Sequence, residues 1–175
     1  SGKDSKMISE GMQNAINEQV NAELYSSYMY AAMSMYFETV DMSGAAGWMK
    51  AQAAEELVHA EKLMDYVNDR GGRVLLEAIE KPPVEWDSVL DAFQAVLKHE
   101  EKVSSLINWL VTLAREEKDH MTDNFLQWFV AEQVEEEATA SEVIRKIKLA
   151  GDSGGGMFMI DRELGQRGSS PDAEN

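Results

Sequence analysis

Four glutamates lie on the apolar faces of predicted helices, where a charged carboxylate is costly to bury. They are Glu23, Glu56, Glu100 and Glu136. Residues seven apart share one face of a helix, and each glutamate has apolar or aromatic residues at those positions, as Glu56 has Met49 and Leu63. One such residue could lie at a stripe edge, but one in each of four helices indicates a shared site.

His59 follows Glu56 by three residues, so both side chains lie on one turn and can bind the same metal ion. The chain has no cysteine, which leaves carboxylates and imidazole as its ligands. Oxygen-rich ligand sets of this kind suit iron, manganese, magnesium or calcium. A single Glu-x-x-His pair is common by chance, but with three further inward glutamates it predicts a dinuclear metal site.

The glutamates also fall at matching heights along their helices. Glu23 lies about fourteen residues before its helix ends, and Glu56 about thirteen after its helix begins, so antiparallel packing brings them together. Glu100 and Glu136 match in the same way.

The fourth helix lacks the second imidazole of a symmetric site. Thr139 stands where a Glu-x-x-His pair starting at Glu136 would place histidine, and the preceding turn carries Gln133. We therefore expect an asymmetric site with a weaker second position, which suits iron that leaves after oxidation.

Further acids crowd the same region and suggest a third metal position. Glu55 precedes Glu56, while Glu132 and Glu135 precede Glu136. The alternative for these three residues is a solvated helix face, and spacing alone does not decide between them.

The net charge of −16 argues against a nucleic-acid partner, because binding phosphates requires basic residues. An anionic surface attracts cations, although it also simply favours solubility. No window approaches the roughly 18 apolar residues of a membrane span. Residues 1–6 are polar and lack the apolar core of a signal peptide. A transit peptide that has already been removed is left as an alternative.

Four long segments with helical periodicity predict an all-α protein. They run over about residues 7–37, 43–70, 88–117 and 122–150, and residues 157–164 form a short fifth helix. The first and third links are short, which predicts antiparallel neighbours.

The link over residues 71–86 is much longer. At about 3.3 Å per residue its roughly 16 residues reach about 53 Å, while a helix of about 28 residues is about 42 Å long. It can therefore cross the whole bundle and make the second and third helices parallel.

The expected organisation has four parts. Residues 1–6 form a disordered tail or a cloning remnant, 7–150 the four-helix bundle, 151–166 a hinge and the fifth helix, and 167–175 a disordered tail. Gly154 to Gly156 are the expected flexible hinge.

The chain resembles the non-haem ferritins of bacteria and archaea over about residues 7–166. The motifs are NEQVNAELYS at 17–26, EELVH at 55–59, KHE at 98–100, NFLQW at 124–128 and EQVEEE at 132–137. This resemblance implies a ferritin-like four-helix bundle with one long crossover, assembled as a homo-oligomeric shell, typically of twenty-four subunits. It also implies a cytoplasmic iron store that oxidises Fe(II) with dioxygen or hydrogen peroxide.

The resemblance assigns the site position by position. The first iron takes Glu23, Glu56 and His59; the second takes Glu56, Glu100 and Glu136, with Gln133 nearby. A third iron would use Glu55, Glu132, Glu135 and Glu136. Tyr30 resembles a tyrosine beside this centre and Trp128 a nearby aromatic, and both could supply electrons, although Trp128 fits ordinary packing equally well.

Several residues differ from those of related families, and the differences bear on haem binding and on the route of iron. Leu57 replaces the methionine that carries haem in bacterioferritins, so no haem is expected. Leu126 replaces one acid of the pair that lines the three-fold pore of animal heavy chains, which leaves the route of iron open. His99 and His120 are expected to do nothing catalytic.

Two other functions stay open from the residues. A di-iron oxygenase or oxidase would need a pocket for an organic substrate. A purely structural shell subunit would not need so complete a ligand set.

Overall fold

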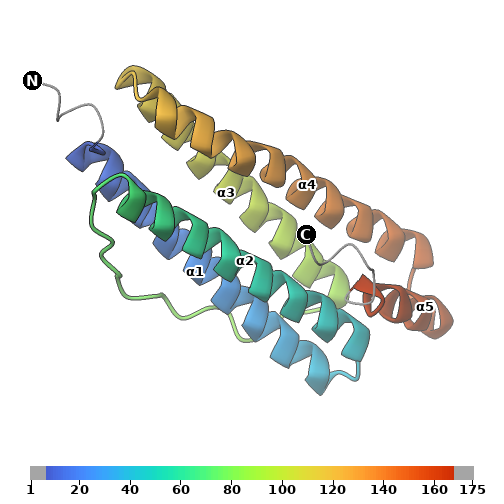
Figure 1. Cartoon of the computed structure of the whole chain (residues 1–175). Helices are drawn as coiled ribbons and strands as arrows, with labels where there is room; N and C mark the ends of the chain where they lie inside the picture. Colours follow the sequence, from blue (N-terminus) through green and yellow to red (C-terminus); the bar gives the residue numbers. More distant parts are fainter. Residues whose placement is uncertain (1–6, 168–175) are drawn as a thin grey trace, which may run out of the picture.

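The computed structural model describes residues 7–167, which contain five α-helices and no strand. They are α1 (Glu10–Thr39), α2 (Ser43–Asp69), α3 (Val89–Glu116), α4 (His120–Ala150) and α5 (Gly154–Leu164). Four long helices lie side by side, and the short α5 lies at one end of the bundle (Figure 1). The expected all-α bundle is confirmed. None of the described helices is long and apolar enough to span a membrane.

Polar caps define where three of the long helices begin. The side chains of Ser9, Ser88 and Asp119 accept hydrogen bonds from backbone N–H groups three residues on, at the starts of α1, α3 and α4. Each cap satisfies a donor that has no partner inside the helix. Because Asp119 caps α4, that helix begins at His120, two residues before the position predicted from its apolar pattern.

The long link crosses the bundle as predicted. It starts where Ile8 N–H donates to the Arg70 carbonyl, and Asn21 Nδ2 then donates to the Ala78 carbonyl. Near the far end of α1, the Tyr36 hydroxyl donates to the Trp86 carbonyl at 2.7 Å. The link therefore runs along α1 from one end to the other and places α3 parallel to α2 (Figure 1).

Two apolar clusters fill the bundle, one at each end. The first contains Phe37, Trp48 and Phe93, and the second contains Leu63 and Phe129. The four inward glutamates fall between these clusters in sequence on every long helix, so the metal centre lies at mid-height between two packed cores.

Gly154 to Gly156, which the sequence suggested as a hinge, form the first turn of α5. Ser153 caps that turn by accepting from Gly156 N–H, which fixes the glycines in the helix. The chain bends instead at Gly151, whose positive φ of 63° suits glycine. The tails expected at residues 1–6 and 168–175 lie outside the described residues, whereas Arg167, expected in the second tail, is described and contacts α2.

α5 docks on the start of α2 through a close backbone approach. The Asp161 carboxylate accepts a hydrogen bond from Ala45 N–H at 2.8 Å. A Cβ atom added to Gly44 would lie 1.8 Å from the Asp161 carbonyl oxygen, so only glycine permits this contact. The same test at Gly47, one turn later, finds nothing within 4 Å.

We expect Gly44→Ala to displace α5, since overpacking costs about 1–3 kcal/mol and helix propensity returns less than about 1 kcal/mol. Gly47→Ala is the matched control and should be neutral or slightly stabilising. Amide hydrogen exchange should show α5 losing protection only in Gly44→Ala. Equal protection in both variants would contradict this account of the docking.

Candidate metal centre

Acidic side chains from all four long helices meet with His59 at mid-height. Three overlapping sets of side chains each place their ligand atoms within 4.8 Å of one another. These sets are Glu23, Glu56 and His59; Glu56, Glu100 and Glu136; and His59, Glu132 and Glu136. Glu56 belongs to the first two sets, which is the arrangement of a carboxylate that bridges two metal ions.

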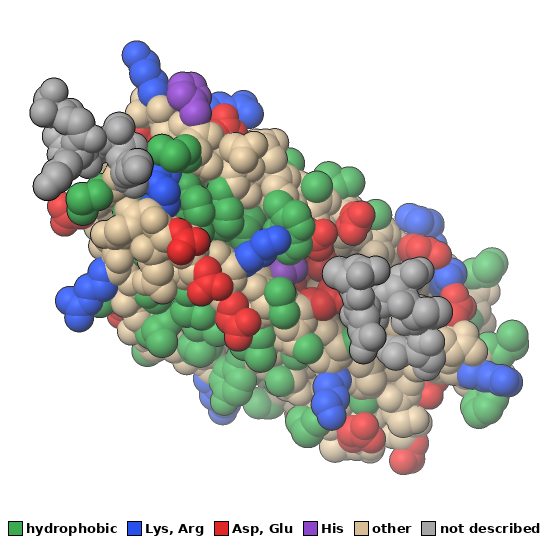
Figure 2. Space-filling model, viewed as in Figure 1, with side chains coloured by type: hydrophobic (Ala, Val, Ile, Leu, Met, Phe, Trp, Pro, Cys, Tyr) green, Lys and Arg blue, Asp and Glu red, His purple; other side chains and the backbone are tan. Residues whose placement is uncertain are grey.

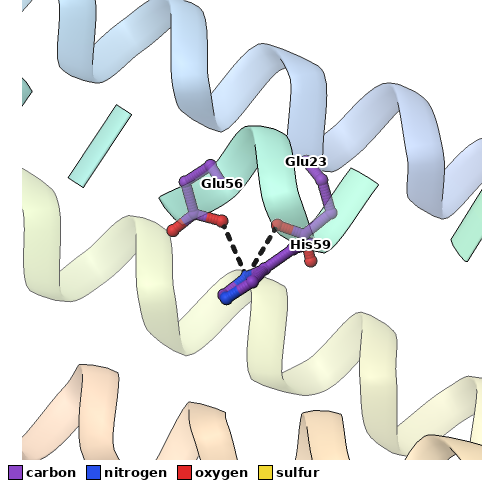
Figure 3. Close-up of side chains that lie close together, drawn as sticks. All are labelled: Glu23, Glu56 and His59. Atoms are coloured by element: carbon purple, nitrogen blue, oxygen red, sulfur yellow. Dashed lines mark ion pairs between the residues drawn. The ribbon is translucent and has the colours of Figure 1, made fainter. Parts of the chain in front are cut away.

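The first set contains α1 and α2 side chains directed at one another (Figure 3). His59 Nδ1 lies 3.2 Å from Glu56 Oε2 and 3.8 Å from Glu23 Oε2. Neither His59 Nδ1 nor Glu23 Oε2 has a hydrogen-bond partner among the described residues, although both atoms are buried. Buried polar atoms normally have partners. Two unpartnered ligand atoms facing each other therefore fit a metal ion between them.

Burial and two carboxylates act in opposite directions on the pKa of His59. Burial disfavours the charged imidazole and lowers its pKa, but the two nearby carboxylates of Glu23 and Glu56 together outweigh burial and raise the pKa of His59 to about 11. In the metal-free protein this proton thus balances part of the acidic charge. A divalent ion would displace it, because metal ligation needs neutral imidazole.

The second set brings α2, α3 and α4 together. Burial raises the pKa of Glu100 to about 7 and the pKa of Glu136 to about 8, and neighbouring carboxylates add to both shifts. Burial is also the main cause that raises the pKa of Glu56 to about 8. The cluster therefore favours protons or other cations at neutral pH.

Tyr30 and Gln133 both donate to Glu100. The Tyr30 hydroxyl lies 2.5 Å from Glu100 Oε1, and Gln133 Nε2 lies 3.1 Å from Glu100 Oε2. Burial raises the pKa of Tyr30 well above its usual value. The phenol therefore stays protonated and directs one Glu100 oxygen, while the Gln133 amide directs the other.

Two buried glutamines in the site were missed from the sequence. Gln52 Nε2 donates to Glu56 Oε1 at 3.1 Å and to Glu136 Oε2 at 2.7 Å. Gln19 Nε2 donates to Glu23 Oε1 at 3.2 Å. Each glutamine stands four residues before a metal-centre glutamate on the same helix face, and that spacing on an apolar stripe was the available signal.

The residues expected at a third position are only partly brought together. Glu132 Oε2 lies 4.0 Å from His59 Nε2, and burial followed by the charge of Glu135 raises the pKa of Glu132. Glu135 and Glu55 are exposed, and the Glu55 carboxylate accepts a hydrogen bond from Arg167. Figure 2 shows acidic side chains gathered along the line between α2 and α4.

The remaining singled-out residues lie around the centre or away from it. Trp128 packs edge-on against His59, with ring centroids 5.3 Å apart, and Lys62 Nζ lies 3.6 Å from the Trp128 ring centroid. His99 faces Ser26 at 2.6 Å, outside the three ligand sets, and His120 is exposed at the start of α4.

Comparisons with known proteins identify the family of this chain. A family model described as a ferritin-like domain matches residues 13–150. A bacterial non-heme ferritin of Bacteroides fragilis is 51% identical over 161 residues, covering 92% of this chain and 100% of that protein. One from Escherichia coli O157:H7 is 40% identical over 158 residues, covering 90% and 96%.

Solved structures give the same result. An open pore ferritin from the hyperthermophilic archaeon Archaeoglobus fulgidus superimposes with a TM-score of 0.91 and 49% sequence identity. The match covers 93% of this chain and 99% of that one. By its sequence, its fold and the donor set of its centre, the chain belongs to the family of ferritin-like domains.

Proposed function

We propose that this protein stores iron, and that it oxidises Fe(II) at the metal centre before storage. The observation that carries the proposal is the pair of buried ligand sets that share Glu56. A carboxylate common to two sites holds two metal ions close enough to act on one oxidant. Membership of the ferritin-like family supports the same function.

Two Fe(II) ions are the substrates of the proposed reaction. Glu23, Glu56 and His59 would bind one ion, and Glu56, Glu100 and Glu136 the other. Oxidation of both ions to Fe(III) releases two electrons. These electrons and two protons reduce dioxygen to hydrogen peroxide, or reduce hydrogen peroxide to two molecules of water.

Protein residues have supporting roles in this proposal. Gln52 and Gln133 keep the carboxylates directed at the ions by donating hydrogen bonds to them. Tyr30 contacts Glu100 and Trp128 packs against His59, so both lie close enough to contribute electrons while the oxidant is reduced. The weaker second position, which lacks imidazole, lets Fe(III) leave for the mineral.

An oxygenase acting on an organic substrate is the second candidate. That function needs a cavity beside the metal ligands. Four cavities among the described residues, including one beside Arg167, are lined by neither His59 nor any of the four inward glutamates. This favours iron itself as the substrate.

We also propose that the chain assembles into a closed homo-oligomeric shell of about twenty-four subunits in the cytoplasm, as the resemblance implies. Phe158 and Met159 on α5 are 70% and 71% exposed, and Leu149 beside them is 89% exposed. Apolar surface of this extent on a short helix is typical of an interface between copies. A shell would keep insoluble ferric oxyhydroxide contained.

Replacing the shared ligand tests the reaction. Glu56→Ala or His59→Ala should abolish rapid Fe(II) oxidation, because each removes a ligand of the first set. Stopped-flow absorbance of the ferric product after aerobic mixing measures the rate. His120→Ala, at an exposed histidine outside the centre, is the control and should match wild type. A wild-type rate of Fe(II) oxidation in Glu56→Ala would contradict the assignment of Glu56 as a shared metal ligand.

The pKa shifts give a pH dependence. Because Glu56, Glu100, Glu136 and His59 all have raised pKa values, the folded metal-free protein binds more protons than the unfolded chain from about pH 5 to 8. Its stability should therefore fall as pH rises through this window, at about 1.4 kcal/mol per pKa unit.

Thermal unfolding of chelator-treated protein across this pH range measures the trend. Metal-loaded protein should show the opposite trend, because its ligands bind the metal deprotonated. Glu56→Gln should flatten the metal-free curve by removing one of the shifted groups. A metal-free curve that rises with pH would contradict the assignment of these shifts.

Assembly is tested at α5. Phe158→Glu should weaken the shell, because it places a charge in an apolar contact between copies. Native mass spectrometry should then show smaller species, and dialysis should release more iron than from wild type. Val134→Glu, at an exposed apolar residue of mid-α4, is the control. A full-sized Phe158→Glu shell would show that α5 is dispensable for closure.

A further inference from the structure

The chain returns to the metal centre after α5 ends. Gly165 packs against Gly44, and the next two residues lead along α2. The Arg167 guanidinium carbon lies 4.5 Å from the Trp48 ring centroid, over the ring. Arg167 Nη2 then donates to Gln52 Oε1 at 2.8 Å and to the two Glu55 oxygens at 3.1 and 3.2 Å. Trp48, Gln52 and Glu55 lie four and three residues apart, so Arg167 follows one face of α2.

Arg167 is connected through Gln52 to two ligand carboxylates. The Gln52 carbonyl oxygen accepts from Arg167, while its amide nitrogen donates to Glu56 and Glu136. Gln52 is fully buried, so its amide has no water to exchange with. With the oxygen engaged by a cation, the amide nitrogen must face the carboxylates. Arg167 thereby fixes the orientation of the Gln52 amide.

Arg167 also binds Glu55, whose carboxylate a third iron ion would need. Glu55 is one of the acids expected at the third position, and here both of its oxygens contact the guanidinium. A guanidinium is a fixed positive charge, so it repels a divalent ion competing for Glu55. The two cations cannot both hold the same carboxylate in this geometry.

The Arg167 guanidinium is only partly hydrogen-bonded at this position. Its Nη1 atom is buried and has no hydrogen-bond partner among residues 7–167, which is unfavourable. Its side chain remains 24% exposed, and Glu55 is 48% exposed. A guanidinium with one unsatisfied side and a path to solvent can be displaced by a metal ion.

We propose that Arg167 is a resident cation of the third iron position, which metal can fill only by displacing it from Glu55. This inference rests on the proposed function, since it concerns the metal centre described there. Arg167 acts as a positioning residue for Gln52 while the position lacks metal. Displacement would free the Gln52 oxygen and so couple the third ion to the two shared carboxylates.

Zinc titration of the assembled full-length protein by calorimetry tests the proposal, because zinc binds oxygen and nitrogen ligands without redox chemistry. Arg167→Ala should keep the two tighter binding events, slightly weakened because Gln52 loses its contact with Arg167, and strengthen a third, weaker event by about 3- to 10-fold, as expected for losing one partly exposed charge. Crystals soaked in zinc should show a third anomalous peak beside Glu55 at a lower zinc concentration than wild type requires.

Three further variants make the result specific. Arg167→Lys keeps the charge and should stay closer to wild type than to Arg167→Ala. Arg162→Ala removes an exposed cation of α5 and should change nothing. Adding Glu55→Gln to Arg167→Ala should cancel the gain. Gel filtration confirms that each variant keeps its native mass, and Arg167→Lys carries the test if Arg167→Ala does not assemble, because weaker stacking on Trp48 should still strengthen the third event.

Each failure has a distinct meaning. Two normal binding events with a third that is absent, or unchanged in the Arg167 variants, would overturn the role of Arg167 alone. A gain that persists without the Glu55 carboxylate would also overturn it. Loss of all binding events in the wild-type protein would overturn the metal centre, and this inference with it.

Discussion

Mutual repulsion among buried carboxylates is the constraint on which the structure depends. Glu56, Glu100 and Glu136 place oxygens within 4.8 Å of one another in a bundle interior between two apolar clusters. Burial and repulsion together favour protonation, which explains why all three pKa values are raised. In the metal-free bundle, protons therefore offset part of this repulsion, and the apolar clusters packed at both ends hold the acids together.

Neutral amides and a phenol make this arrangement tolerable without cancelling its charge. Gln19, Gln52, Gln133 and Tyr30 each donate to a metal-centre glutamate. A lysine or arginine at these positions would neutralise the carboxylates and repel a metal ion. An amide orients a carboxylate while leaving its charge for the ion. Within residues 7–167, the guanidinium that touches this network belongs to Arg167, and it donates to the oxygen of Gln52 and not to Glu56 or Glu136.

The sequence predicted the parts that local periodicity controls. Seven-residue spacing located the inward glutamates, and the long link between Arg70 and Ser88 was sufficient to predict the crossover. Helix starts were less certain, because a cap such as Asp119 acts through one hydrogen bond outside the apolar pattern. Arg167 could not be predicted at all. It reaches Glu55 across 112 positions of sequence, through a backbone approach at Gly44 that no periodic pattern encodes.

The asymmetry seen in the sequence becomes a difference between the two metal positions. One set combines His59 with Glu23 and Glu56, and His59 Nδ1 and Glu23 Oε2 face each other without hydrogen-bond partners among the described residues. The other has only carboxylates, and Gln133 Nε2 is already committed to Glu100 and Ser104. In the proposed function, the position without imidazole is the one from which an oxidised ion leaves first, and Gln52 connects Glu136 of that position to Arg167.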